Sequence, residues 1–367
     1  KIPKSIELSK QSDNGIIIPA GLLSKLIAIY PDAEVIDQRQ SVLANIPFTG
    51  ALRSYQEQFV GDAINAEGGV LVMNTGGGKT VSAIALASRV NQRTMILVKS
   101  KDLAEQWRGA IKQFTGLEAG LIGGGKSTEG EQFTIGLVQT LVKRDLSKLN
   151  YGLVIADETH NIPSNQAFKV INGINAKYKY GLTATCQRRD NMEFMIHAAI
   201  GEIVAEVKQE QLQGKVLPVE ITVIEHDFHE KPEFDGWSDY IDTITNDDIR
   251  NELIVGETDL NCTVYNKPTI ILCSTVKHCE ILTELAEDQY LEPLLIHGQL
   301  PSKVRRERMN QAPTSMLIIG TSQLLSEGID WPHLEVLIFA SPMSAVIDKE
   351  NPAATILRGN IKIKTAR

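Results

Sequence analysis

Val70-Leu71-Val72-Met73-Asn74-Thr75-Gly76-Gly77-Gly78-Lys79-Thr80 is the stretch that decides the fold. Its first residues are aliphatic and β-branched, which predicts a short, buried parallel strand. After the glycines and Lys79-Thr80, residues 81–87 have helix-forming composition. A strand, a glycine turn and a helix N-terminus together present backbone N–H groups to a polyphosphate. The stretch therefore predicts a phosphate-binding loop in an α/β fold.

Each residue type in this loop suits that chemistry. A Cβ atom at Gly76, Gly77 or Gly78 would block the approach of the backbone to phosphate. Lys79 would reach the β- and γ-phosphates, and the Thr80 hydroxyl would sit on Mg²⁺. The sequence thus predicts a magnesium-bound nucleotide at 73–80.

A second glycine-rich stretch fits the usual loop pattern better but lies in the wrong context. Residues 120–127, Gly-Leu-Ile-Gly-Gly-Gly-Lys-Ser, match G-x-x-x-x-G-K-S to the letter. A polar loop and a strand-like run at 133–138 follow, and no helix begins at Lys126. Without a helix N-terminus there is no row of free N–H groups to hold a phosphate. We therefore expect 120–127 to be a glycine-rich turn.

The composition sets broad limits on the class of protein. The 367 residues are enough for two globular domains, and 43% hydrophobic with 22% charged residues is ordinary. No apolar run approaches membrane-spanning length, and no signal-peptide pattern opens the chain, so we expect a cytoplasmic protein. The four cysteines have no zinc-like spacing. A net charge of −8 does not favour nucleic acid as a partner, although a local basic groove is compatible with it.

Polar residues follow several strand-like runs. Lys99-Ser100 follows 94–98, and Thr140 follows 133–138. The carboxyl ends of parallel strands are where open α/β sheets bind ligands. Ser100 also suits a helix N-cap, so that role stays open.

Two further segments carry candidate chemistry. Residues 153–156 form a hydrophobic strand that ends in Asp157-Glu158. Asp157 suits Mg²⁺ and Glu158 suits the activation of a water molecule, with a helix cap as the alternative. Thr183 and Thr185, which end the next strand-like run, can hydrogen-bond to the acidic loop. His160 could couple the two segments, or be structural.

Before the loop strand, residues 52–58 predict the start of a helix. Gln56 offers a donor and an acceptor that suit the edge of adenine, and Arg53 could support it. A plain surface helix is the alternative.

Strands and helices alternate again after residue 262, which predicts a second parallel unit. We expect an α/β protein with two tandem parallel-sheet domains and a small N-terminal α+β unit. The predicted boundaries are 1–47 for the N-terminal unit, 48–207 for domain 1, 208–261 for a connection with a helical lead-in, and 262–367 for domain 2.

Six motifs in order carry a family resemblance: Leu-Arg-x-Tyr-Gln (52–56), Thr-Gly-Gly-Gly-Lys-Thr (75–80), Asp-Glu-Thr-His (157–160), Leu-Thr-Ala-Thr (182–185), His-Gly (297–298) and Glu-Gly-Ile-Asp (327–330). The chain resembles the superfamily 2 helicases, within them the XPB/Rad25 group, and most of all the phage branch-migration helicases of the UvsW type. The resemblance implies two RecA-like domains that use ATP and Mg²⁺ to move along single-stranded or branched DNA. It leaves the oligomeric state open, and a monomer is compatible with it.

The resemblance also implies roles by position. The ATP contacts would be Arg53, Gln56, Thr75, Gly76, Gly77, Gly78, Lys79, Thr80, Gly328 and Asp330. The catalytic residues would be Lys79, Asp157 and Glu158. Thr80 and Asp157 would bind Mg²⁺. The coupling residues would be His160, Thr183 and Thr185. The DNA-backbone contacts would be Lys99, Ser100, Thr140, Ser274, Thr275 and Thr321. For each backbone contact, a solvated cap is the alternative.

One departure from the family concerns its last motif, Gln-x-x-Gly-Arg-x-x-Arg, which is absent after Ala340-Ser341-Pro342. We hypothesise that a stretch bearing these arginines is missing between Ala345 and Val346. From the resemblance, our leading hypothesis for the function is an ATP-dependent DNA helicase or translocase that acts on branched DNA. It would work in replication, recombination or repair, in a bacterium or a phage-infected host. The alternatives are a duplex translocase without unwinding, an RNA-dependent ATPase, and a nucleotide-gated scaffold that hydrolyses little.

Overall fold

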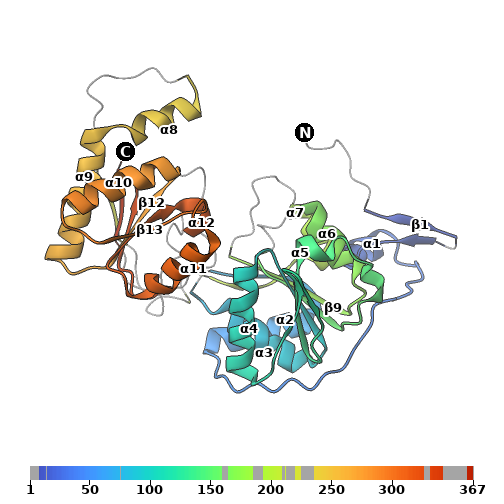
Figure 1. The fold of residues 1–367 in the computed structure, drawn as a ribbon. Helices are drawn as coiled ribbons and strands as arrows, with labels where there is room; N and C mark the ends of the chain where they lie inside the picture. Colours follow the sequence, from blue (N-terminus) through green and yellow to red (C-terminus); the bar gives the residue numbers. More distant parts are fainter. Residues whose placement is uncertain are drawn as a thin grey trace. The chain divides into compact units, whose positions relative to one another are not determined.

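The computed structural model describes residues 8–13, 15–74, 76–158, 164–184, 193–208, 211, 220–224, 235–325, 331–341 and 362–366. The chain divides into two compact units, Lys1–Leu212 and Gln213–Arg367. Each unit is built on its own sheet, with helices packed against it (Figure 1). The finer four-part division predicted from the sequence stays a prediction.

The sheet of the first unit has the strand order β10-β3-β9-β8-β4-β7-β5-β6. Its strands are β3 Gly68–Met73, β4 Thr94–Val98, β5 Gly120–Gly123, β6 Lys126–Thr128, β7 Phe133–Leu137, β8 Leu153–Ala156, β9 Tyr178–Thr183 and β10 Ile203–Val207. All neighbours pair in parallel except β5 and β6, which are antiparallel. Strands β4, β7 and β8 are buried along their whole length, as expected for a parallel sheet with helices on both faces.

Two groups of helices cover this sheet. One group is α2 Ser54–Ala66, α3 Lys79–Val90 and α4 Lys101–Thr115, and the other is α5 Val138–Leu141, α6 Ser164–Gly173 and α7 Glu193–Ile200. Within each group, helices that follow one another along the chain pack together (Figure 1). Aliphatic residues of β3, β4 and β8 form a core with α6 and α7. A short 3₁₀ turn, η2 Leu146–Lys148, precedes β8.

The N-terminal segment packs on the first unit. It contains β1 Lys10–Ser12, β2 Gly15–Ile17, η1 Ala20–Leu22 and α1 Leu23–Ile29. Strands β1 and β2 form an exposed hairpin, and η1 contacts α7. Further along, the Val42 N–H donates to the Gln92 side chain, and Ser88 donates to the Ile46 carbonyl.

The second unit has a six-stranded sheet, in the order β11-β16-β15-β12-β14-β13, in which every pair is parallel. Its strands are β11 Glu220–Ile224, β12 Thr269–Cys273, β13 Pro293–Ile296, β14 Leu317–Thr321, β15 Val336–Phe339 and β16 Lys362–Ala366. Its helical segments are α8 Trp237–Thr245, α9 Asp248–Asp259, the π-helical turn η5 Leu260–Val264, α10 Val276–Asp288, α11 Ser302–Gln311, the 3₁₀ turn η6 Ala312–Thr314 and α12 Ser322–Leu325. Parallel sheets thus organise both units, as predicted.

The second glycine-rich stretch, 120–127, is a β-hairpin. Strand β5 ends at Gly123 and β6 begins at Lys126, and these two residues pair across a two-residue turn. Both turn residues, Gly124 and Gly125, have positive φ angles of 62° and 87°. Such angles are typical of a type I′ hairpin turn, which glycine favours. The prediction of a turn rather than a phosphate loop is confirmed.

Candidate functional site

The first candidate loop joins β3 to α3, as its sequence predicts. Helix α3 begins at Lys79, directly after Gly78, whose φ angle of 90° lies in the left-handed region. A Cβ atom at Gly78 would clash with Nε2 of Gln56, and one at Gly77 would lie 2.7 Å from Cγ of Met73. Packing at both positions, and the backbone conformation at Gly78, therefore favour glycine.

Residues at the start of α2 form hydrogen bonds to this loop. Gln56 Nε2 and the Tyr55 hydroxyl both donate to the Gly77 carbonyl, at 2.8 and 2.9 Å. Gln56 Oε1 accepts from the Arg53 backbone N–H at 2.8 Å, and the Arg53 guanidinium donates to the Tyr55 hydroxyl at 3.3 Å. Arg53 and Gln56 therefore lie beside the loop, and their recognition of adenine stays a prediction. Tyr55 is a part of the site to which sequence reasoning gave no role.

An ion pair connects the loop to the acidic segment. Lys79 Nζ lies 2.9 Å from Glu158 Oε1, with side-chain exposures of 11% and 24%. Strands β3 and β8 are separated only by β9, so their carboxyl ends lie at the same edge of the sheet. Glu158 has a φ angle of 49°, which turns the chain where β8 ends. The structure thus brings together two motifs that lie 79 residues apart.

Asp157 is the buried member of the acidic pair. Its Oδ2 accepts from Trp107 Nε1 at 2.8 Å, and its Oδ1 accepts from the Glu158 backbone N–H at 3.0 Å. Burial, together with the neighbouring Glu158 carboxylate, raises the pKa of Asp157 to about 6, while Lys79 and the Trp107 hydrogen bond oppose that shift. Trp107 lies in α4 and is a second site residue that sequence reasoning missed.

The residues at this edge fit a Mg²⁺ ion held jointly with phosphate. A cation near Asp157 and Glu158 would offset the repulsion between the two carboxylates. Thr80, in the first turn of α3, adds a hydroxyl from the loop side. Among the described residues, no group of three or more His, Cys, Asp or Glu side chains could hold a metal alone.

Thr183 ends β9, the strand between β3 and β8, and is buried. It pairs with Val72 of the loop strand, which suits the predicted coupling role. Five other predicted site residues lie outside the described part of the chain: Thr75, His160, Thr185, Gly328 and Asp330. The junction at 345–346, where a missing segment was hypothesised, also lies outside it.

The backbone contacts predicted in the first unit lie at the same edge of the sheet. Lys99 and Ser100 follow β4, and Thr140 lies in α5 directly after β7, the neighbour of β4. Ser100 Oγ accepts from the Leu103 backbone N–H at 3.3 Å, so Ser100 caps α4, as the alternative held. Its contact with a nucleic acid stays a prediction.

In the second unit, Ser274 and Thr275 follow β12, and Thr321 is the last residue of β14. Thr275 caps α10 by accepting from the His278 N–H at 3.2 Å. The Ser274 N–H donates to Ser341 Oγ at 3.1 Å. Thr321 pairs in register with the last residue of β12 and is only 8% exposed. The three residues share one edge of the sheet, and Thr321 is the least accessible.

Two family models match the chain. The model of the type III restriction enzyme res subunit matches residues 49–188, and that of the helicase conserved C-terminal domain matches residues 250–357. The first match contains the Lys79–Glu158 pair, and the second contains the β12–β14 edge. The chain belongs to the superfamily 2 helicases.

Relatives of this helicase include XPB proteins. The DNA 3'-5' translocase XPB2 of Sulfurisphaera tokodaii is 29% identical over 50% of the chain and 43% of the relative. The DNA 3'-5' helicase XPB of Kineococcus radiotolerans is 30% identical over 46% of the chain and 33% of the relative. A protein of Acanthamoeba polyphaga mimivirus, whose name places it among ATP-dependent RNA helicases, is 26% identical over 86% of the chain and 63% of the relative. The helicase thus spans 33% to 63% of the length of these three relatives.

A solved helicase domain supports the fold of the chain. The helicase domain of Pyrococcus furiosus Hef aligns with a TM-score of 0.58 at 12% identity, over 86% of this helicase and 95% of that chain. T4 UvsW aligns over 98% of this helicase and 80% of that chain, at 18% identity and a TM-score of 0.43. The superfamily and the XPB-like character are confirmed, and the narrower likeness to UvsW stays a prediction. Among the described residues, no helix has the length and apolar character needed to cross a membrane.

Proposed function

We propose that this chain is the ATP-driven motor of a DNA helicase or translocase that acts on branched DNA, by unwinding forks or junctions or by branch migration. The observation that carries the proposal is the 2.9 Å pair between Lys79 and Glu158, because it joins a phosphate-binding lysine to a candidate base. A buried carboxylate, Asp157, lies directly beside the pair.

Each residue has a role that its position supports. Lys79 would bind the β- and γ-phosphates, and Thr80 and Asp157 would hold Mg²⁺. Bound Mg²⁺ neutralises charge on the phosphates. Glu158 orients and deprotonates the attacking water. Phosphate oxygens compete with Glu158 for the Lys79 ammonium, so the arrival of nucleotide frees the carboxylate to act as a base.

The nucleic acid would lie along the carboxyl edges of the sheets. Residues at these edges would bind the sugar–phosphate backbone: Lys99, Ser100 and Thr140 in the first unit, and Ser274, Thr275 and Thr321 in the second. Such contacts position a strand without reading its sequence. The names of the XPB relatives support DNA as the substrate and a 3′ to 5′ polarity. Replication, recombination or repair is the proposed setting.

A second candidate is an RNA-dependent ATPase, which the name of the mimivirus relative favours. We place it second because both XPB relatives are named for DNA.

The test is the rate of ATP hydrolysis with Mg²⁺, alone and with single-stranded DNA, duplex DNA, a four-way junction and RNA. A Lys79→Ala variant controls for contaminating ATPases. We expect the largest stimulation by branched DNA, and its loss in the variant. Stimulation by RNA alone would move the assignment to the second candidate. No hydrolysis with any polymer would leave a nucleotide-gated scaffold.

A further inference from the structure

A buried lysine at the start of β9 carries a charge that no described residue compensates. Lys179 is 6% exposed, and its partner in register, Val154, lies in the aliphatic core that β8 forms with α6 and α7. Among the described residues, none forms a hydrogen bond or an ion pair with the Lys179 ammonium. Burial, and then the charge of Arg39, lower the pKa of Lys179 to about 8, so the group is still largely charged at neutral pH. Because buried charges are normally paired, this lysine indicates an anionic ligand.

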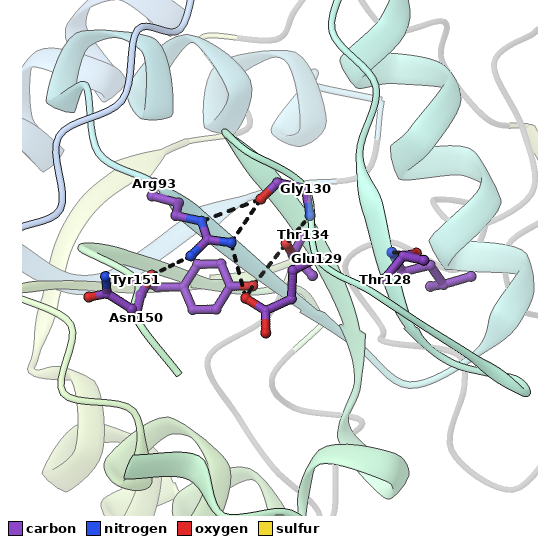
Figure 2. Close-up of polar contacts among 8 residues, drawn as sticks. Arg93, Thr128, Glu129, Gly130, Thr134, Asn150 and Tyr151 are labelled. Carbon is purple, nitrogen blue, oxygen red and sulfur yellow. Dashed lines mark hydrogen bonds and ion pairs between the residues drawn. The ribbon is translucent and has the colours of Figure 1, made fainter. Parts of the chain in front are cut away.

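Arg93, at the same edge of the sheet, shows how a cation there is normally paired (Figure 2). It directly precedes β4, which runs parallel to β8 and, through it, to β9. Its guanidinium donates to Glu129 Oε2 and to the Gly130 carbonyl, both at 3.0 Å. It also lies over the Tyr151 ring, 4.7 Å from the centroid. Lys179 has no such carboxylate or carbonyl among the described residues.

Arg39 brings a second cation to the start of β9. Residues 39–40 lie along the segment that leads into this strand, where Gln40 pairs in parallel with Ala176. Arg39 Nη1 donates to the Lys177 carbonyl at 3.1 Å. Lys177 and Lys179 are two positions apart, which is about 7 Å along an extended chain. The Arg39 guanidinium is therefore near Lys179, in agreement with its effect on the pKa of that lysine.

Asp37 fixes the Arg39 guanidinium in place. Its Oδ1 accepts from Arg39 Nε at 2.9 Å, and its Oδ2 accepts from Arg39 Nη2 at 2.8 Å. The side-chain hydrogen bonds from Arg39 lower the pKa of Asp37 to about 2, so this carboxylate is committed to Arg39. Among the described residues, Nη1 and Nη2 have one acceptor each, which leaves each nitrogen a further N–H to donate.

We propose that Arg39 and Lys179 form a binding site for a small oxyanion of the phosphate class. The site lies at the start of β9, whereas the nucleotide site lies at the other end of the strands, beyond Thr183. The oxyanion would accept from the remaining N–H groups of Arg39 and from the Lys179 ammonium, a combination that suits phosphate. The low exposure of Lys179 favours a free ion, such as phosphate or sulfate, over a phosphate group carried on a polymer. The bound ion would tie residues 37–40 to β9.

The test is thermal unfolding of the full chain at neutral pH, in sodium phosphate and in sodium chloride of equal ionic strength. Every protein carries Lys79→Ala, which weakens phosphate binding at the nucleotide loop. The test variant adds Lys179→Met, which keeps the length of the side chain and removes its charge. The matched control adds Lys177→Met, which removes a cation two positions away whose Nζ lies 5.4 Å from the centroid of the Tyr178 ring.

Phosphate also stabilises proteins generally, because it is excluded from their surfaces, so the comparison between variants measures the site. With phosphate well above its dissociation constant, we expect the parent and the Lys177→Met control to gain about 2–4 °C more in melting temperature than Lys179→Met. In chloride, Lys179→Met should be at least as stable as the parent, because it no longer buries an unpaired charge.

Equal gains in the parent and in Lys179→Met would overturn the proposal. A second measurement, equilibrium dialysis with radiolabelled phosphate, does not depend on stability. In it the Lys179→Met protein should bind less phosphate than the parent and the control, and equal binding by all three would also overturn the site. Neither measurement uses ATP or a nucleic acid, so a failure here leaves the proposed function standing.

Discussion

Trp107 Nε1 donates a 2.8 Å hydrogen bond to Oδ2 of Asp157, so a tryptophan of α4 holds the carboxylate that directly follows β8. Trp107 is 2% exposed, and the bond therefore lies in a region of low dielectric, where it is strong. It fixes the orientation of Asp157 at the edge where the phosphate loop also ends. The remaining lone pairs of the Asp157 carboxylate can coordinate a cation.

The pKa of Asp157, about 6, predicts a pH dependence of hydrolysis. A carboxylate must be ionised to hold Mg²⁺, so we expect Mg²⁺-dependent ATPase activity to fall as the pH drops through about 6. Saturating Mg²⁺ should move the midpoint to lower pH, because the cation favours the ionised form. The measurement is a pH–rate profile at low and high Mg²⁺. A midpoint that does not move with Mg²⁺ would contradict the metal role of Asp157.

The same shift predicts an opposite trend in stability. The folded state binds this proton more tightly than the unfolded state, whose carboxyl has a pKa near 3.8. The contribution of Asp157 to the free energy of unfolding is thus largest below about pH 3.8 and is lost as the pH rises from there through about 6. Urea unfolding of the wild type and of Asp157→Asn between pH 4 and 7 should reveal a fall in stability from pH 4 to about 6 that the variant lacks.

The Glu158→Gln variant distinguishes the role of Glu158 as a base in hydrolysis from the role of Lys79 in binding phosphate. The amide cannot accept a proton from water, so we expect hydrolysis to fall by about 10²-fold or more. Lys79 loses its carboxylate partner, so nucleotide affinity should be retained or rise. Single-turnover hydrolysis and binding of a fluorescent ATP analogue give the two quantities. Glu105→Gln, which removes an exposed carboxylate paired with Arg108, is the control and should change neither.

Gly78→Ala tests the packing of the loop. The alanine would have to adopt a φ of 90° and displace the Gln56 amide from Gly77, so we expect a loss of about 1–2 kcal/mol in unfolding free energy. Nucleotide affinity should fall too. Gly109→Ala is the matched control, since its Cβ meets open space in α4 and should stabilise the helix by about 0.5–1 kcal/mol. A Gly78→Ala protein with full affinity would contradict this account.

His278 lies in a hydrogen-bonded chain that fixes its tautomer. Because Ser341 Oγ accepts from the Ser274 N–H, its own proton is free to go to His278 Nδ1, 3.1 Å away. Nε2 then carries the hydrogen and donates to Asn251 Oδ1 at 2.9 Å. Nitrogen NMR of labelled histidine should show a neutral ring protonated at Nε2. A ring protonated at Nδ1 would contradict the chain.

Burial, and then the nearby Arg250 charge, lower the pKa of His278 to about 4. The unfolded chain binds a proton more readily, with a pKa near 6.5. The stability of the second unit should therefore be full above pH 6.5 and decline as the pH falls toward 4. Unfolding of the wild type and of His278→Gln over that pH range tests the prediction, because only the wild type carries this slope.

The features that could be predicted from the sequence are those that depend only on residues close together along the chain. The buried strand 94–98 could be predicted to the residue, because a parallel strand covered on both faces is a continuous apolar run. The choice between the two glycine stretches also succeeded, because a helix either follows the lysine or does not. Trp107 could not be found in this way, since it meets Asp157 only across 50 residues, through the docking of α4 on the sheet. The contacts of Arg93 with Glu129 and Tyr151 depend on the sheet order in the same way.

The hairpin at 120–127 has a practical consequence for experimental controls. An investigator who chose a hydrolysis-dead mutant from the pattern alone would substitute Lys126, and we expect that protein to keep its ATPase activity. Any cellular phenotype of that mutant would then be blamed on lost hydrolysis when the defect lay elsewhere. A search with that pattern misses Lys79, because Met73 stands where the pattern requires a glycine, yet Lys79 is the position that we propose to substitute.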